Sequence, residues 1–166
     1  MTEEVPKFLL DANVLIAAHR SYYAFDICPG FWEAVKTGHA AARIFSTQRV
    51  LAELRRGGDA LLDWVEAELP EGFFLDDSAA SVISEYAPMM QWVQSRDFHT
   101  SAKTKFASDA DGWLVAMAKH AGYTLVTHEV RRDAKAKVPM PNVCDQFGVN
   151  YCDTYEMLRA LACSFR

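Results

Sequence analysis

The sequence lacks the paired cysteines and long apolar runs that mark several large classes of protein. Its cysteines, Cys28, Cys144, Cys152 and Cys163, form no C-x-x-C pair and have no histidine beside them at zinc-ligand spacing. We expect them to be reduced and mostly buried. No uncharged apolar run approaches the roughly 20 residues of a membrane span, and residues 1–7 do not resemble a signal peptide. We therefore expect a cytoplasmic protein that does not bind membranes.

Basic residues are also fewer than acidic ones. There are 17 basic and 22 acidic residues, which gives a net charge of -5 at pH 7. This balance argues against a protein that coats nucleic acid through a broad basic surface, but it allows a nucleic-acid enzyme with a local basic rim around an acidic metal site. No repeat or linker interrupts the 166 residues, of which 51% are hydrophobic. We expect one domain over residues 1–166.

Short apolar runs alternate with segments of helical character. The predicted strands are Phe8–Leu10, Arg43–Ser46, Phe73–Leu75, Tyr123–Val126 and an edge strand at Val149–Tyr151. The predicted helices are Val14–Ala18, one from Phe31, one from Ser46 or Thr47 to Gly57–Gly58, Asp59–Leu69, most of 79–106 with a break or bend near Pro88, Asp109–Ala121 and Met157–Cys163. A basic surface loop is predicted at Val130–Pro141. Strands separated by helices indicate an α/β fold, with three α/β/α layers around a mostly parallel sheet of four to five strands.

The first predicted strand, Phe8–Leu10, runs directly into Asp11. Three apolar residues in a row suit a strand that is covered on both faces. Right-handed crossovers gather the carboxyl ends of parallel strands along one edge, where α/β proteins bind ligands. Asp11 or Asn13 could instead simply cap the following helix. This stretch alone leaves both interpretations open.

Two further acids occupy unusual positions in predicted helices. Glu53 lies at the margin of an apolar stripe, although it could also be an exposed partner of Arg49. Asp111 precedes Leu114 by three residues on the apolar face of its helix, where an unpaired charge is costly. A capping box formed by Ser108 and Asp111 is the alternative.

A fourth acid, Glu129, follows the fourth predicted strand, with Thr127 at the strand end. It could be a solvated loop acid, and Asp133 could take the same role. Together the four acids lie on different elements around one edge of the sheet. Carboxylates this close cannot all ionise without a cation, and Mg²⁺ or Mn²⁺ prefers oxygen ligands. Such a site can activate water against a phosphodiester.

These motifs resemble those of the PIN-domain nucleases. The similar elements are Phe8–Asn13, with its D-x-N; Glu53; Asp111–Ala118, which reads Asp-x-x-aliphatic-aliphatic-Ala-x-Ala; and Leu125–Glu129, a strand followed by Thr-x-acid. Pro29–Trp32 and Pro141–Cys144 also resemble segments of a VapC-like subfamily. Their order and spacing match along nearly the whole chain. One departure is that the last acid, usually Asp in the family, is Glu129 here.

The resemblance implies an endoribonuclease that uses Mg²⁺ or Mn²⁺ and metal-activated water to cleave single-stranded or structured RNA. It also implies the toxin of a type II toxin–antitoxin pair, with an antitoxin partner and a homodimer. The implied site consists of metal ligands Asp11, Asp111, Glu53 and Glu129, which are also the catalytic residues, and supporting residues Asn13 and Thr127.

Binding of RNA would require contacts from basic side chains, although the chain as a whole carries a net negative charge. The residues expected to contact phosphates are Arg131, Arg132, Lys135 and Lys137, although they could equally form a solvated loop. A catalytically weak PIN-like module that binds RNA or protein is an alternative function. Another Mg²⁺ phosphohydrolase, of the haloacid-dehalogenase type, is disfavoured because it needs a second Asp where Asn13 stands.

Overall fold

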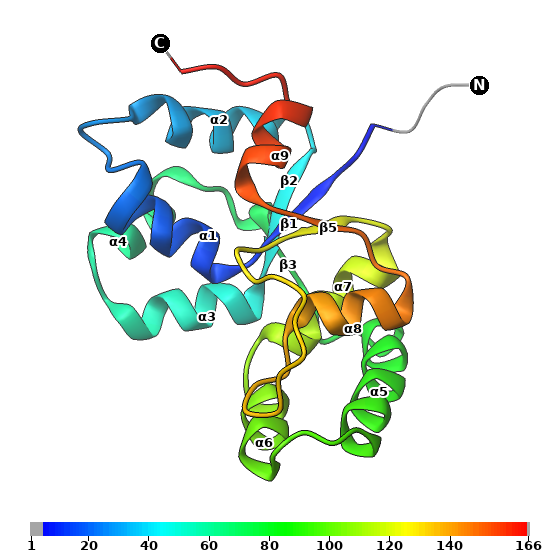
Figure 1. Cartoon of the computed structure of the whole chain (residues 1–166). Helices are drawn as coiled ribbons and strands as arrows, with labels where there is room; N and C mark the ends of the chain where they lie inside the picture. Colours follow the sequence, from blue (N-terminus) through cyan, green and yellow to red (C-terminus); the bar gives the residue numbers. More distant parts are fainter. Residues whose placement is uncertain (1–4, 166) are drawn as a thin grey trace.

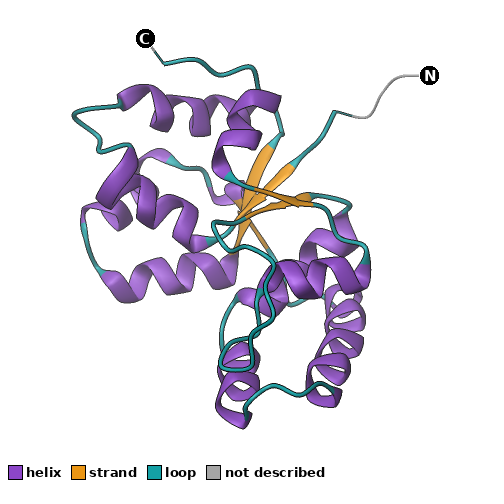
Figure 2. Cartoon of the chain, in the orientation of Figure 1, coloured by secondary structure: helices purple, strands orange, loops and turns teal. Residues whose placement is uncertain are grey.

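The computed structural model describes residues 5–165 and contains a five-stranded parallel sheet at its centre (Figure 2). The strands are β1 (Phe8–Leu10), β2 (Ile44–Thr47), β3 (Phe74–Leu75), β4 (Thr124–Val126) and β5 (Tyr151–Cys152). Their order across the sheet is β3-β2-β1-β4-β5, and every neighbouring pair is parallel. The predicted α/β class, with a parallel sheet and short strands, is confirmed.

Helices cover both faces of the sheet (Figure 1). They are α1 (Ala12–Ala17), continued by a π-helical turn η1 (Ala18–Tyr22), α2 (Pro29–Ala40), α3 (Gln48–Gly57), α4 (Ala60–Glu68), α5 (Ala80–Ser95), α6 (Thr100–Ser108), α7 (Asp111–Ala121), α8 (Met140–Phe147) and α9 (Thr154–Ala160), with a 3-10 turn η2 at Glu71–Phe73. From β1 the chain moves to β2 and β3 on one side and later to β4 and β5 on the other. Right-handed crossovers therefore place α1–α4 on one face and α5–α8 on the other.

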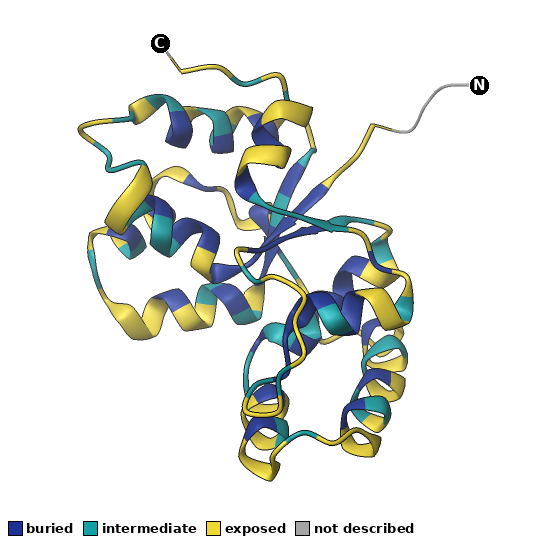
Figure 3. Ribbon diagram, viewed as in Figure 1, coloured by how far each residue is buried: buried dark blue, intermediate teal, exposed yellow. Residues whose placement is uncertain are grey.

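The core is centred on β1, which lies in the middle of the sheet (Figure 3). Leu9 and Leu10 are fully buried, as are Ile44 on β2 and Leu125 on β4. The uninterrupted apolar run of β1 is explained by this position, because helices cover both of its faces. The strand is thus a rigid support for the residue that follows it.

Three predicted boundaries are wrong, and each has a local reason. Pro88 lies inside α5, and the chain breaks instead between α5 and α6, at residues 96–99. Pro88 and Ser84 are both exposed, so the Ser84 carbonyl that lost its helical donor faces water. The predicted loop Val130–Pro141 ends early, because Met140 begins α8 with Pro141 in its first turn.

The last helix also begins earlier than predicted, at Thr154 rather than Met157. The side chain of Asp153 caps it by accepting a hydrogen bond of 2.8 Å from the backbone N–H of Glu156. All four cysteines are free, as expected. Among the described residues, no helix is long and apolar enough to cross a membrane.

Replacing Gly38 should test how tightly α2 packs on the sheet. A Cβ at this position would lie 2.4 Å from Cδ1 of the fully buried Ile44. Gly38→Ala should therefore lower the free energy of unfolding by about 1–3 kcal/mol, because overpacking outweighs the gain in helix propensity. Gly57→Ala is the matched control, since nothing lies within 4 Å of its Cβ. Urea unfolding of both variants is the measurement, and equal stability of the two would contradict this packing.

Candidate active site

Asp11 and Thr127 meet at the carboxyl ends of two paired strands. Leu10 of β1 pairs with Val126 of β4, so the next residue of each strand reaches the sheet edge at the same level. The backbone N–H of Asp11 donates to the carbonyl of Val126 at 3.1 Å. The Thr127 hydroxyl donates to Oδ2 of Asp11 at 3.3 Å. Asp11 occupies the N-cap position of α1, but its side chain forms no capping hydrogen bond of good geometry, and the nearby backbone N–H of Asn13 only weakly favours its ionised form, being the last of the causes that act on its pKa.

The Asp11 carboxyl is only 3% exposed and lies in a field of negative charge. Burial is the largest cause that raises its pKa from the ordinary 3.8 to about 7. The charges of three other acids raise that pKa further, namely Asp111, Glu129 and Glu53. The four acids singled out in the sequence therefore act on one another, and burying Asp11 in its ionised form is costly without a compensating cation.

Asp111 is the first residue of α7. The alternative of a capping box is wrong, because no side chain caps α7 and the Ser108 hydroxyl donates to the carbonyl of Lys105 instead. Burial, followed by the charge of Glu129, raises the pKa of the Asp111 carboxyl to about 7, while the nearby cation of Lys137 lowers it. Asp11 is thus a buried carboxyl and Asp111 a half-buried one, and the pKa of each is raised to about 7.

Glu129 has partners that the sequence did not predict. Its side chain is 15% exposed, and its Oε1 accepts a hydrogen bond of 2.5 Å from Nζ of Lys137. Its Oε2 accepts one of 2.8 Å from the backbone N–H of Met140 at the beginning of α8, a favourable place for a carboxylate. The signal for α8 was Pro141, since proline is frequent in the first turn of a helix.

The surroundings of Glu53 differ from the expected pair with Arg49. Glu53 is exposed on α3, although partial desolvation of its carboxyl, followed by the charge of Asp109, raises its pKa. The Nε of Arg49 lies 3.4 Å from the buried Asp77, and the guanidinium lies 3.9 Å above the ring of Trp113. The alternative reading of Glu53 as a partner of Arg49 is therefore wrong.

Of the remaining predicted site residues, Asn13 is near the acids in sequence and the others lie mostly around a neighbouring cavity. Asn13 is exposed and close in sequence to Asp11. Asp133 lines a separate cavity between α5 and α8, and its charge is not among those that raise the pKa of Asp11 or Asp111. Two of the predicted RNA contacts are engaged with acids in ion pairs, Arg131 with Asp145 at 2.6 Å and Lys135 with Asp97 at 2.7 Å.

The donor set fits a hard divalent cation held by few protein ligands. Within residues 5–165, no three aspartate, glutamate, histidine or cysteine side chains converge as a complete ligand set. The carboxyls of the buried Asp11 and the half-buried Asp111 nevertheless have pKa values raised to about 7, so a cation would offset the cost of ionising them. Mg²⁺ commonly binds through one or two carboxylates and keeps several waters. Glu129 would have to leave Lys137 to join them directly.

Solved structures share this fold. The crystal structure of FitAcB from Neisseria gonorrhoeae superposes with a TM-score of 0.54 and 19% identity, covering 87% of this chain and 95% of that one. The structure of VapBC2 from Rickettsia felis bound to a DNA fragment from their promoter superposes with a TM-score of 0.55 and 13% identity, covering 88% of this chain and 97% of that one. No protein of curated function is detectably similar in sequence.

The five-stranded parallel sheet and the helices on its faces match a PIN-like fold, and the predicted likeness to that fold is confirmed. The family model described as "Domain of unknown function (DUF4411)" matches residues 8–165, and the chain belongs to this family.

Proposed function

We propose that the protein is a metal-dependent endoribonuclease that cleaves single-stranded or structured RNA. The observation that carries the proposal is the pair of carboxyls formed by the buried Asp11 and the half-buried Asp111, whose pKa values are raised to about 7 at the carboxyl edge of the sheet. A protein that used this edge only for structure would have no need to withdraw two acids from water among further acids. Perturbed acids gathered in this way are typical of catalytic sites.

In this proposal Asp11 and Asp111 hold Mg²⁺ or Mn²⁺, with Glu53 and Glu129 completing the site directly or through water. The bound cation would lower the pKa of water and stabilise charge on the phosphate. Thr127 orients Asp11 through its 3.3 Å hydrogen bond. Lys137 and the Met140 N–H orient Glu129. Asn13 would hydrogen-bond to the ligands or to the substrate.

The structural neighbours support a more specific role. FitAcB and VapBC2 are toxin–antitoxin complexes whose toxins are PIN domains. By analogy, this chain would be the toxin of such a pair, a cytoplasmic homodimer inhibited by an antitoxin protein. Arg131, Arg132, Lys135 and Lys137 remain the proposed phosphate contacts, with Lys137 also holding Glu129.

The direct test of this function is cleavage of single-stranded and hairpin RNA by the purified chain. We expect cleavage with Mg²⁺ or Mn²⁺, none with EDTA, and products with 5′-phosphate and 3′-hydroxyl ends. Equal cleavage in EDTA, or no cleavage of either RNA with either cation, would contradict the proposal.

Thr127→Val should weaken catalysis without removing any acid. The variant loses the donor to Asp11 and the acceptor for the N–H of Glu129. Residues that orient metal ligands typically contribute 10–100-fold, so we expect a loss of roughly that size in Mn²⁺ affinity and in cleavage. Thr127→Ser keeps the hydroxyl and should restore most of both. Calorimetric titration with Mn²⁺ and RNA cleavage are the measurements, and full activity of Thr127→Val would exclude this role.

A further inference from the structure

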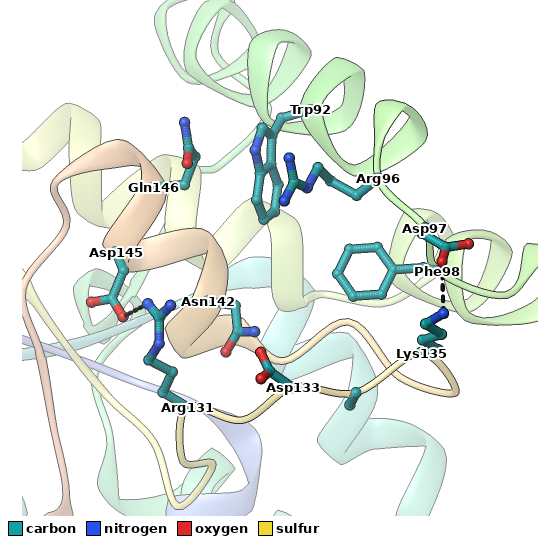
Figure 4. A pocket seen from close by; sticks show the side chains of 11 residues that line it. Trp92, Arg96, Asp97, Phe98, Arg131, Asp133, Lys135, Asn142, Asp145 and Gln146 are labelled. Carbon is teal, nitrogen blue, oxygen red and sulfur yellow. Dashed lines mark hydrogen bonds and ion pairs between the residues drawn. The ribbon is translucent and has the colours of Figure 1, made fainter.

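A cavity of about 510 Å³ is lined in part by residues that begin two positions after Glu129 of the candidate active site. Its walls are the end of α5, the link between α5 and α6, residues 131–135 and one side of α8 (Figure 4). This volume is within the range of pockets that bind small molecules. The cavity has no part in the function proposed above, and none of the four acids of the candidate active site lines it.

The walls of this cavity are held in place by polar contacts. Two exposed ion pairs join neighbouring walls, Lys135 with Asp97 at 2.7 Å and Arg131 with Asp145 at 2.6 Å, although exposed pairs contribute little to stability. The Asn142 side chain also holds both backbone polar groups of Arg132, since its Nδ2 donates to the carbonyl at 2.8 Å and its Oδ1 accepts from the N–H at 3.2 Å. The cavity therefore has defined walls although its loop is exposed.

Two charged side chains and two aromatic rings of the cavity remain available to a ligand. Among residues 5–165, neither the Arg96 guanidinium nor the Asp133 carboxylate forms a hydrogen bond or an ion pair. The Arg96 guanidinium lies 5.6 Å from the centre of the Trp92 ring, and the ring of Phe98 meets that of Trp92 edge to face at 6.4 Å. Figure 4 shows all four side chains around the same opening. The cavity thus combines aromatic surface with one donor group and one acceptor group.

We propose that this cavity binds a guanine base of single-stranded RNA; the source of the base rests on the function proposed above. Unstacked bases are recognised by aromatic stacking and by hydrogen bonds to their edges. Guanine offers two N–H donors on one edge, which the Asp133 carboxylate can accept, and two acceptors, O6 and N7, on another edge. An arginine guanidinium donates to these two acceptors. No other RNA base carries two donors and two acceptors in this arrangement.

The cavity is placed to serve RNA that is bound at the acids. Arg131 follows Glu129 by only two residues, so at most about 7 Å of chain separates the acidic site from the wall of the cavity. A base one or two nucleotides from the cleaved phosphate could therefore enter. This placement favours a nucleotide over a peptide as the occupant of the cavity, because a base bound there would belong to the same RNA whose phosphate lies at the acids.

The experiment uses the full-length chain with Asp11→Asn, so that bound RNA is not cleaved. Single-stranded hexamers of RNA with one guanine or with adenine in its place are titrated, with fluorescence anisotropy as the readout. Arg96→Ala should weaken binding of the guanine hexamer about tenfold, and Asp133→Asn should reduce the preference for guanine to less than twofold. Lys119→Ala is the matched control. Like Arg96→Ala it removes one positive charge, but Lys119 lies in the last turn of α7, outside the cavity, where it pairs with Glu85. This variant should change affinity less than twofold.

A second readout separates the cavity from catalysis. In ¹⁵N-labelled wild-type chain, guanosine 5′-monophosphate should shift the indole N–H signal of Trp92, and cytidine 5′-monophosphate should not. If the chain cleaves RNA but the Trp92 signal and the hexamer affinities of both variants stay unchanged, the cavity proposal is overturned and a peptide partner becomes the better occupant. If the Trp92 signal shifts but no RNA is cleaved under any condition, the cavity proposal stands and the nuclease function fails.

Discussion

Asp11→Asn should abolish metal-dependent RNA cleavage and leave the fold intact. An amide cannot supply the negative charge that a divalent cation needs, and the loss of several kcal/mol of metal-assisted stabilisation corresponds to a rate decrease of roughly 10³-fold or more. The fold should persist, because Asn keeps the size of Asp and removes a buried charge at a site that is 3% exposed. Cleavage of labelled single-stranded RNA in Mn²⁺ and far-UV circular dichroism are the measurements.

Asp26→Asn is the control for this experiment. Asp26 is exposed in the loop before α2, so its replacement changes the net charge equally and should leave cleavage within about twofold of wild type. Cleavage by Asp11→Asn at the wild-type rate would mean that this edge of the sheet is not the catalytic site.

The second large effect concerns stability, pH and metal. The carboxyls of Asp11 and Asp111 have pKa values of about 7 in the folded chain, against 3.8 when unfolded. Between these values the folded state retains protons that the unfolded state has released. In EDTA the free energy of unfolding should therefore fall as pH rises from about 4 to 7, by on the order of 3 kcal/mol for each of the two groups. No further loss from these groups is expected above pH 8.

Mn²⁺ should reverse this loss, because it binds the ionised carboxylates and stabilises the folded state. The variant Asp11→Asn isolates the contribution of Asp11 from that of Asp111 and other titrating groups, since its stability should fall about half as much over the same pH range. Urea unfolding at pH 5 and pH 7.5, with EDTA or Mn²⁺, makes this comparison. Parallel pH profiles for wild type and variant would show that Asp11 does not titrate as described.

The sequence predicted the centre of the molecule better than its periphery. The strand Phe8–Leu10 could be read from the chain because its run of apolar residues has no other common explanation than burial on both faces. Asp11 followed from that strand, since the end of a central parallel strand has a fixed place in the fold. The ends of helices with strong local caps, such as Thr47 before α3 and Gly58 after it, were equally accessible.

The contacts of the acids could not be predicted, because they depend on tertiary structure. Glu129 is held by Lys137 and by the beginning of α8, a helix whose first two residues lie in a segment that was predicted as a loop from its two prolines. Arg49 lies one helical turn from Glu53, yet it stacks on Trp113 of a distant helix instead. Sequence spacing shows which side chains can meet along one helix, but not which neighbour from another element competes for them.

The most direct test of the account is the position of Mn²⁺ in a crystal of the protein soaked in this ion. If Asp11 and Asp111 form the centre of a metal-dependent active site, the anomalous difference map should show a peak between their carboxylates. A peak elsewhere, with these two side chains apart, would remove both from the ligands and contradict the account.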